Sequence, residues 1–144
     1  MNRVALGLGL LSLLCLNLYA IPQQSKADES AVRDTVTDYI EGYYTGDAAR
    51  MEKSMHPHYL KHTVKESHGK LHMSETTGLQ MLQNVKMEAG EVPPSERKEQ
   101  IIVLDISGDI ASAKLVTPHW VDYLTLTKWN GDWKIVSVVL RENQ

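Results

Sequence analysis

The sequence lacks several features that would narrow its function at once. Only one of its 144 residues is a cysteine, Cys15, so no intramolecular disulfide can form, and phenylalanine is absent. Positive charge is not in excess, because 15 Lys and Arg stand against 18 Asp and Glu, so a basic nucleic-acid-binding surface is not expected. No phosphate-binding loop, dinucleotide fingerprint or nucleophile elbow occurs. The hydrophobic content of 42% is too high for a disordered chain, and the length fits one globular domain.

The N-terminal segment has the pattern of a secretory signal peptide. Arg3 precedes an almost unbroken apolar run over residues 4–16, which suits a signal core and is short for a membrane span. Small residues fit cleavage after Ala20 or after Ala27, and an uncleaved N-terminal anchor is the alternative. We therefore expect a signal peptide over residues 1–27 and a mature domain over residues 28–144. The mature protein is expected to be secreted or periplasmic, with no stable membrane insertion.

Three helices are predicted before the main run of strands. The first is capped by Asp28 or Ser30 and ends near residue 44, and the second covers residues 48–55 with Asp47 as its cap. Gly46 fits the end of the first helix, because glycine readily adopts the left-handed conformation found there. The third helix is capped by Ser74 and ends near residue 87. Its inward positions are expected to be Leu79, Leu82 and Val85.

Alternating and β-branched segments predict the strands. One strand is expected over residues 58–65, and others over residues 100–106, 110–117, 120–129 and 132–140. The Asn130-Gly131 pair is the strongest local signal, because both central residues of a type I′ hairpin turn need a positive φ. Helices followed by antiparallel strands indicate the α+β class, with the long first helix lying across a curved sheet.

The two-residue turn also predicts which residues share a face of the sheet. Counting back from the turn pairs Leu126 with Ile135 and Asp122 with Val139. One face then carries Trp120, Asp122, Leu124, Leu126, Ile135 and Val139. The opposite face is also largely apolar, with Val121, Tyr123, Thr125, Val136, Val138 and Leu140. We expect one face to pack against the helices and the other to meet a second copy of the chain or an irregular loop.

Five side chains are candidates for a pocket at the wide end of this sheet. They are Tyr39 and Tyr43 from the first helix, His62 from the first strand, and Trp120 and Asp122 from the long hairpin. Asp122 is the most informative, because an unpaired buried carboxylate costs several kcal/mol. It could form a salt bridge with Arg141 or Arg33, act as a polar anchor or general base, or be exposed if the register is wrong.

The histidines between residues 56 and 72 do not form a convincing metal site. His58 and His62 lie about 13 Å apart if their strand is straight, and no recognised ligand motif joins them. We therefore predict neither a metal nor a cofactor. The alternation puts His62 between Leu60 and Val64 on the inward face. There it is either a core histidine hydrogen-bonded to a tyrosine or a residue that contacts a ligand.

Several motifs together resemble the putative lumazine-binding proteins of the nuclear transport factor 2-like superfamily, a SnoaL-like or cystatin-like fold. The resemblance covers residues 29–141, nearly the whole mature chain. Its marks are the segments Asp38-Tyr39-Ile40-Glu41-Gly42-Tyr43, Gly46-Asp47, His56-Pro57, Asp122-Tyr123-Leu124 and Gly131-Asp132-Trp133-Lys134-Ile135-Val136.

The resemblance implies a cone in which a strongly curved antiparallel sheet wraps around the long first helix, with two further helices. It also implies a homodimer formed through the outer face of the sheet. Function transfers poorly on this scaffold, which hosts isomerases, dehydratases, cyclases and ligand binders that do no chemistry. We expect an exported protein that binds a small, partly aromatic molecule in an enclosed hydrophobic pocket. The alternative is an isomerase, dehydratase or cyclase that uses Asp122 or His62 as its general base.

Overall fold

The computed structural model describes residues 26–87 and 92–143 and contains three α-helices and one six-stranded sheet. Most of the predicted signal peptide, including Ala20, lies outside the described residues. Ala27, the residue after which the second predicted cleavage occurs, lies in the first turn of helix α1 (Lys26–Thr45). No helix within the described ranges is both long enough and apolar enough to cross a membrane.

The end of the first helix and the start of the second follow the sequence pattern, whereas Asp28 and Ser30 lie inside helix α1 and do not cap it. Helix α1 buries Val32, Val36 and Ile40, and Gly46 follows it with a φ of 72°. Asp47 caps helix α2 (Ala48–Ser54) by accepting a hydrogen bond of 2.9 Å from the Arg50 backbone N–H. These two boundaries are as predicted, because each rests on a residue with a distinct local preference.

The third helix begins later than predicted. Helix α3 covers Gly78–Met87, because the residues before it form a strand instead. Its buried residues are Met81 and Val85, whereas Leu79 is exposed, so the predicted inward position of Leu79 is wrong. A short 3₁₀ turn, η1 (Pro94–Glu96), follows.

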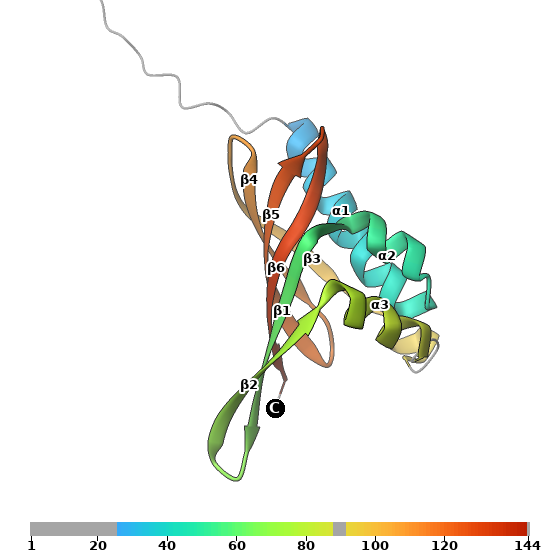
Figure 1. The fold of residues 1–144 in the computed structure, drawn as a ribbon, viewed down its shortest axis with the longest axis vertical. Helices are drawn as coiled ribbons and strands as arrows, with labels where there is room; N and C mark the ends of the chain where they lie inside the picture. The colour runs from blue at the N-terminus through green and yellow to red at the C-terminus, as the bar shows by residue number, and fades with distance from the viewer. Residues whose placement is uncertain (1–25, 88–91, 144) are drawn as a thin grey trace, which may run out of the picture.

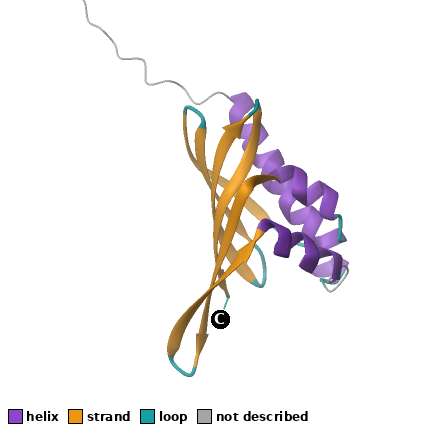
Figure 2. Ribbon diagram, in the orientation of Figure 1, coloured by secondary structure: helices purple, strands orange, loops and turns teal. Residues whose placement is uncertain are grey.

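The sheet has the strand order β2-β1-β6-β5-β4-β3. All neighbouring strands are antiparallel except β1 and β6, which are parallel, so the sheet is mixed. The helices lie on one side of the curved sheet, which confirms the α+β class and the cone-like arrangement (Figures 1 and 2). The strands are β1 (Met55–Ser67), β2 (Lys70–Thr77), β3 (Gln100–Ser107), β4 (Ile110–Val116), β5 (Trp120–Trp129) and β6 (Asp132–Glu142).

The strand β2 was not predicted. It joins β1 through a turn at His68 and Gly69, whose φ angles of 52° and 72° are both positive. The far end of this β1–β2 hairpin extends beyond the helices in the lower part of Figure 1. Seven of the eight residues of β2 are exposed, so the inward-facing apolar residues that identify other strands are missing here.

The long hairpin of β5 and β6 keeps the predicted turn but not the whole predicted register. Asn130 and Gly131 have φ angles of 52° and 92°, and Leu126 pairs with Ile135 as expected. The register then shifts by one residue between Thr125 and Leu126, so that Asp122 lies opposite Leu140 instead of Val139.

The cause of the shift is a β-bulge that adds one residue to β6, and one extra residue reverses which face the following side chains occupy. Val138 and Leu140 are therefore buried, and Val139 is 45% exposed. The predicted faces of these three residues are wrong. The β5 side chains keep their predicted faces, because the extra residue belongs to β6.

The face predicted for β1 is also wrong. Tyr59 and Lys61 point inward and are buried, whereas His62 lies on the outer face, 3.3 Å from Glu75 of β2. The strand begins at Met55, which is buried, and its pairing with β6 is irregular between Met55 and Leu60. The alternation of residues 58–65 alone did not decide between the two faces, because each carries apolar and polar side chains.

The close packing of α1 against α2 generates a test at Gly42. A Cβ atom added there would lie 2.9 Å from both the Cβ and the backbone nitrogen of Met51. We expect Gly42→Ala to lower the free energy of unfolding by about 1–3 kcal/mol, because a backbone atom cannot move aside easily. The matched control is Gly78→Ala, where the nearest atom would be 3.7 Å away. Urea denaturation followed by circular dichroism measures both, and an equal effect of the two substitutions would contradict the packing described.

Candidate functional site

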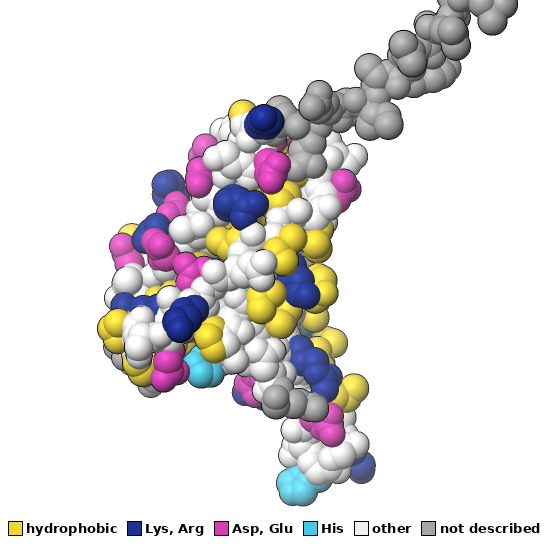
Figure 3. Space-filling view, turned by 180° about the vertical axis from the view of Figure 1, so that it is seen from behind, with side chains coloured by type: hydrophobic (Ala, Val, Ile, Leu, Met, Phe, Trp, Pro, Cys, Tyr) yellow, Lys and Arg dark blue, Asp and Glu magenta, His cyan; other side chains and the backbone are white. Residues whose placement is uncertain are grey.

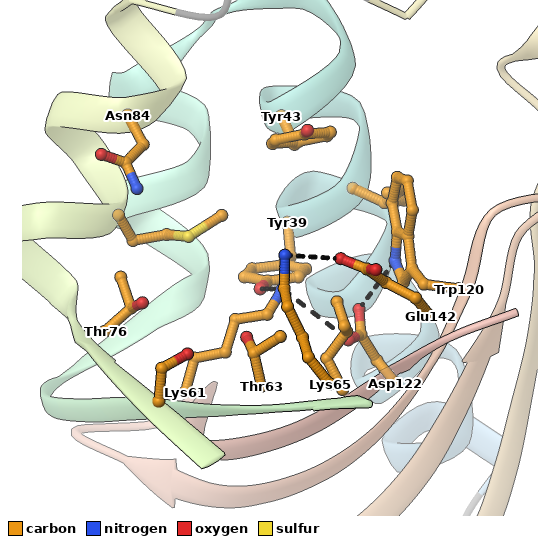
Figure 4. A pocket seen from close by; sticks show the side chains of 14 residues that line it. Tyr39, Tyr43, Lys61, Thr63, Lys65, Thr76, Asn84, Trp120, Asp122 and Glu142 are labelled. Atoms are coloured by element: carbon orange, nitrogen blue, oxygen red, sulfur yellow. Dashed lines mark hydrogen bonds and ion pairs between the residues drawn. The ribbon is translucent and has the colours of Figure 1, made fainter. Parts of the chain in front are cut away.

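One pocket opens between the helices and the concave face of the sheet, with a volume of about 330 Å³. Helices α1 and α3 and strands β1, β2, β5 and β6 contribute to its walls (Figure 4). The expectation of an enclosed, mainly hydrophobic pocket is wrong, because the pocket is partly open and polar and apolar side chains are interspersed along its lining. The residues are Tyr39, Ile40, Tyr43, Lys61, Thr63, Lys65, Ser74, Thr76, Met81, Asn84, Trp120, Asp122, Leu140 and Glu142.

Four of the five side chains proposed from the sequence line this pocket. Tyr39 and Tyr43 come from α1, and Trp120 and Asp122 come from β5. The Tyr43 and Trp120 rings meet edge to face with their centroids 5.7 Å apart. His62 is not among the lining residues, because its side chain points to the opposite face of the sheet.

Asp122 is the most buried charged group of the site. Its residue exposure is 0%, and its Oδ2 atom accepts a hydrogen bond of 3.3 Å from the Trp120 indole N–H. The other oxygen, Oδ1, has no hydrogen-bond partner and lies 3.7 Å from the Lys61 ammonium nitrogen. Neither arginine considered from the sequence is its partner, because Arg141 pairs with Glu66 and Arg33 pairs with Glu29.

Lys61 is a pocket residue that the sequence analysis does not identify. The alternation that predicts an inward His62 puts its neighbour Lys61 on the opposite face, yet the Lys61 side chain is only 11% exposed and its Nζ atom donates to the Tyr39 hydroxyl at 3.3 Å. The Tyr39 and Tyr59 hydroxyls are themselves hydrogen-bonded at 2.8 Å. A continuous set of polar contacts therefore runs from Tyr59 through Tyr39 and Lys61 to Asp122. The burial of Tyr59 in the structure fixes the face on which Lys61 lies, and the alternation within residues 58–65 does not signal it.

Burial controls the electrostatics of this set. Desolvation raises the pKa of the Asp122 carboxyl and lowers the pKa of the Lys61 ammonium, and the attraction between the two groups opposes both shifts. Burial, the neighbouring Tyr59 and the Asp122 charge together raise the pKa of Tyr39 well above its usual value. The Tyr39 hydroxyl therefore keeps its proton at neutral pH and can still donate or accept a hydrogen bond.

A second ion pair lies at the edge of the same pocket and differs in exposure. Lys65 Nζ is 2.8 Å from Glu142 Oε1, and both side chains are more than half exposed. Exposed ion pairs of this kind contribute about 0–1 kcal/mol to stability. Removing one partner of a buried pair is strongly destabilising, because it leaves the other charge buried without a counter-charge. Figure 4 shows Lys61 and Lys65 on one strand, with Lys61 reaching toward Tyr39 and Asp122.

The histidines do not assemble a metal centre. His56 stacks on His58 with ring centroids 5.5 Å apart, and His62 faces Glu75. Within residues 26–87 and 92–143, no group of three or more His, Cys, Asp or Glu side chains is arranged to hold a metal ion.

Residues 27–141 match the model of a protein family described as "Putative lumazine-binding". No curated protein sequence matches the chain.

Solved structures with the same fold are numerous, and we compare three. A nuclear transport factor 2-like protein of unknown function from Shewanella baltica aligns with a TM-score of 0.68 and 19% identity, over 85% of this chain and 99% of that one. A similar protein from Silicibacter pomeroyi gives 0.66 and 19%, over 84% and 100%. A ketosteroid isomerase-like protein from Erwinia carotovora gives 0.59 and 11%, over 83% and 99%. At these identities the likeness concerns the fold alone.

Removing the Lys61 ammonium tests the buried pair. We expect Lys61→Met to lower the free energy of unfolding by about 3–5 kcal/mol at pH 7.5, because Asp122 would remain buried without a counter-charge. A carboxyl whose pKa is raised in the folded state contributes stability below its unfolded pKa of about 3.9, and this is lost as the pH rises through the folded value. The loss in the variant, relative to the wild type, should therefore be smaller at pH 5 than at pH 7.5.

Denaturation curves at several pH values measure this difference, and Lys65→Met is the matched control. Lys65 lies on the same strand but in the exposed pair, so its removal should change stability by less than about 1 kcal/mol at every pH. A loss for Lys61→Met that does not depend on pH would contradict the proposed coupling.

Proposed function

The chain belongs to the family described as "Putative lumazine-binding", and from that premise we propose that it binds a small, partly aromatic molecule in the pocket between α1 and the sheet. The observation that carries this proposal is the Asp122 carboxylate. It is fully buried at the pocket wall and retains one oxygen, Oδ1, without a hydrogen-bond donor. A buried acceptor of this kind is costly to leave unsatisfied, so a ligand that donates an N–H or O–H group to it gains the corresponding free energy.

The neighbouring side chains support a ligand with both a flat apolar part and polar edges. Tyr43 and Trp120 provide aromatic surface beside Asp122. Thr63, Ser74, Thr76 and Asn84 provide hydrogen-bonding groups along the opposite walls. A heterocycle with several N–H and C=O groups would use both kinds of surface, and lumazine, which the family description names, is such a compound.

A second candidate function is acid–base catalysis of the isomerase or dehydratase type. The observation that favours it is that a carboxyl with a raised pKa and a protonated tyrosine, Asp122 and Tyr39, line one pocket. One structural neighbour is named ketosteroid isomerase-like. Asp122 would be the base, because His62 is on the other face of the sheet. Incubation of a ketone with the protein in heavy water decides this, since a general base would exchange the proton next to the carbonyl.

We also propose that the protein is exported, with cleavage after Ala20 or Ala27, on the basis of the apolar N-terminal segment. Cleavage at either position would leave Asp28 in place. This residue binds Lys128 at 2.7 Å and the Trp133 indole N–H at 3.1 Å. The start of α1 therefore remains attached to the β5–β6 hairpin after either cleavage.

The outer face of the sheet supports a homodimer. One row of residues crosses five strands there in the order Glu75, His62, Val139, Tyr123 and Lys114. Val139 and Tyr123 are 45% and 54% exposed, and charges of opposite sign stand at the two ends of the row. A two-fold axis at the centre would place the Lys114 end against the Glu75 end of the other copy. Hydrophobic side chains interleaved with Lys and Arg are visible in Figure 3.

The binding proposal predicts a loss of affinity in Asp122→Asn. Small molecules that co-purify with the protein would be identified by native mass spectrometry, and these and lumazine would be titrated calorimetrically. A lost hydrogen bond to a charged acceptor is worth about 1.5–3 kcal/mol, so affinity should fall by about 10–100-fold. The control is Glu142→Gln at the exposed edge of the same pocket, which should change affinity little. Unchanged affinity in Asp122→Asn, with the fold verified by circular dichroism, would refute the proposal that Asp122 accepts a hydrogen bond from the ligand.

The dimer proposal predicts that Val139→Asp yields a monomer, because two buried carboxylates would face each other across the two-fold axis. Sedimentation velocity measures the mass in solution. Leu79→Asp is the control, since Leu79 is equally apolar and 68% exposed but lies on α3, on the helical side. A monomeric wild type, or a dimer that survives Val139→Asp, would refute this interface.

A further inference from the structure

The Lys61 amine is almost buried at the wall of the pocket, and the proposed ligand binding does not by itself require a buried amine there. It is at the wall of the pocket, its side chain is 11% exposed, and its Nζ atom lies 3.3 Å from the Tyr39 hydroxyl oxygen and 3.7 Å from Asp122 Oδ1. Lys65, four residues further along the same strand, lines the same pocket but extends into solvent and pairs with Glu142. One strand thus presents two amines to one pocket in contrasting surroundings.

The surroundings of Lys61 favour a reactive amine. A lysine is a nucleophile only in its uncharged form, which desolvation promotes. Burial shifts Lys61 and Asp122 in complementary directions, each toward its uncharged form. Transfer of the ammonium proton to the carboxylate would therefore create a neutral pair without taking up or releasing a proton. The exposed Lys65 has no comparable partner inside the protein.

We propose that Lys61 captures aldehydes or ketones in this pocket as an imine. The Lys61 nitrogen lone pair attacks the carbonyl carbon, a C–N bond forms, and the carbonyl π electrons move to the oxygen, which takes a proton. The nitrogen, which became positively charged in the attack, then loses one proton to give a neutral carbinolamine. Loss of the C–O bond as water, together with the last proton on nitrogen, leaves the C=N double bond. The net change is amine plus carbonyl to imine plus water, with no oxidant or reductant.

Two neighbouring groups are placed to move the protons of this sequence. The Tyr39 hydroxyl is within hydrogen-bond distance of the amine and is held by Tyr59, so it can donate to the carbonyl oxygen as negative charge develops. Asp122, which holds a proton in the neutral pair, can give it to the carbonyl oxygen, regain a proton from the nitrogen, and deliver that proton to the departing hydroxyl group. It takes up the last proton on nitrogen as the C=N bond forms. The edge-to-face pair of Tyr43 and Trp120 favours carbonyl compounds that carry an aromatic ring.

Reductive trapping tests the proposal on the whole chain. The protein is incubated at pH 7 with benzaldehyde and sodium cyanoborohydride, which converts an imine into a stable benzyl amine. Peptide mapping by mass spectrometry then compares the modified fraction at each lysine. We expect Lys61 to be modified at least about tenfold faster than Lys65, because burial lowers the pKa of the Lys61 amine and so increases its uncharged, nucleophilic form. Equal modification of Lys61 and the exposed lysines would overturn the proposal.

Two matched variants complete the experiment. Lys61→Arg keeps the positive charge but removes the primary amine, so the fast adduct should disappear, whereas it should persist in Lys65→Arg. Persistence of the fast adduct in Lys61→Arg would also overturn the proposal. Mapping of the wild type needs no variant, so a folding defect in Lys61→Arg leaves the main comparison intact.

The covalent step goes beyond the proposed ligand binding, although it uses the same pocket. Calorimetry with ligands that lack an aldehyde or ketone group distinguishes a failure of imine formation from a failure of the proposed binding function. Ligand binding that depends on Asp122, with no preferential Lys61 adduct, would refute imine formation alone. A Lys61 adduct without any measurable Asp122-dependent binding would refute the proposed binding function alone.

Discussion

The contact between Lys61 and Asp122 is the constraint on which the interior of this protein depends. The two residues belong to β1 and β5, which lie on either side of β6, so their side chains meet above the central strand. Leu140 of β6 is paired with Thr63 on one side and with Asp122 on the other, and it lies in the floor of the pocket beneath them. The hydroxyls of Tyr39 and Tyr59 extend the polar contacts from this pair toward α1, on the concave side of the sheet.

The parts of this arrangement that were predictable are those that a single local preference decides. Asn130 and Gly131 fix their turn because each tolerates a positive φ, and Asp47 caps α2 because its side chain satisfies a free backbone N–H. The inward direction of Asp122 followed from counting along β5 alone, which contains no irregularity before the turn. The α+β class and the family resemblance were both confirmed, since they rest on the order of elements along the whole chain.

The parts that failed depend on contacts between distant residues. The bulge in β6 moved Val138 and Val139 to opposite faces from those expected, and no local signal marks it. The face of β1 is decided by the burial of Met55 and Tyr59 against elements elsewhere in the chain, which alternation within residues 58–65 does not contain. As a result, His62 was predicted in the pocket, whereas its neighbour Lys61 occupies that face in the structure. The position of Asp122 at the pocket could be predicted from the sequence, but that of Lys61, its ion-pair partner, could not.

The projecting β1–β2 hairpin has a consequence for how the proposed ligand would enter and leave the pocket. Ser74 and Thr76 form part of the pocket wall, yet both belong to β2, an edge strand whose side chains are almost all in solvent. Segments with so little buried surface are the ones that detach first in local fluctuations, while strands at the centre of a sheet stay closed. For the proposed ligand, brief separation of β2 from β1 would open a route into the pocket while α1 stays packed against the sheet. The rate of ligand exchange would then depend on this edge strand, and the selectivity on the side chains of the inner pocket wall.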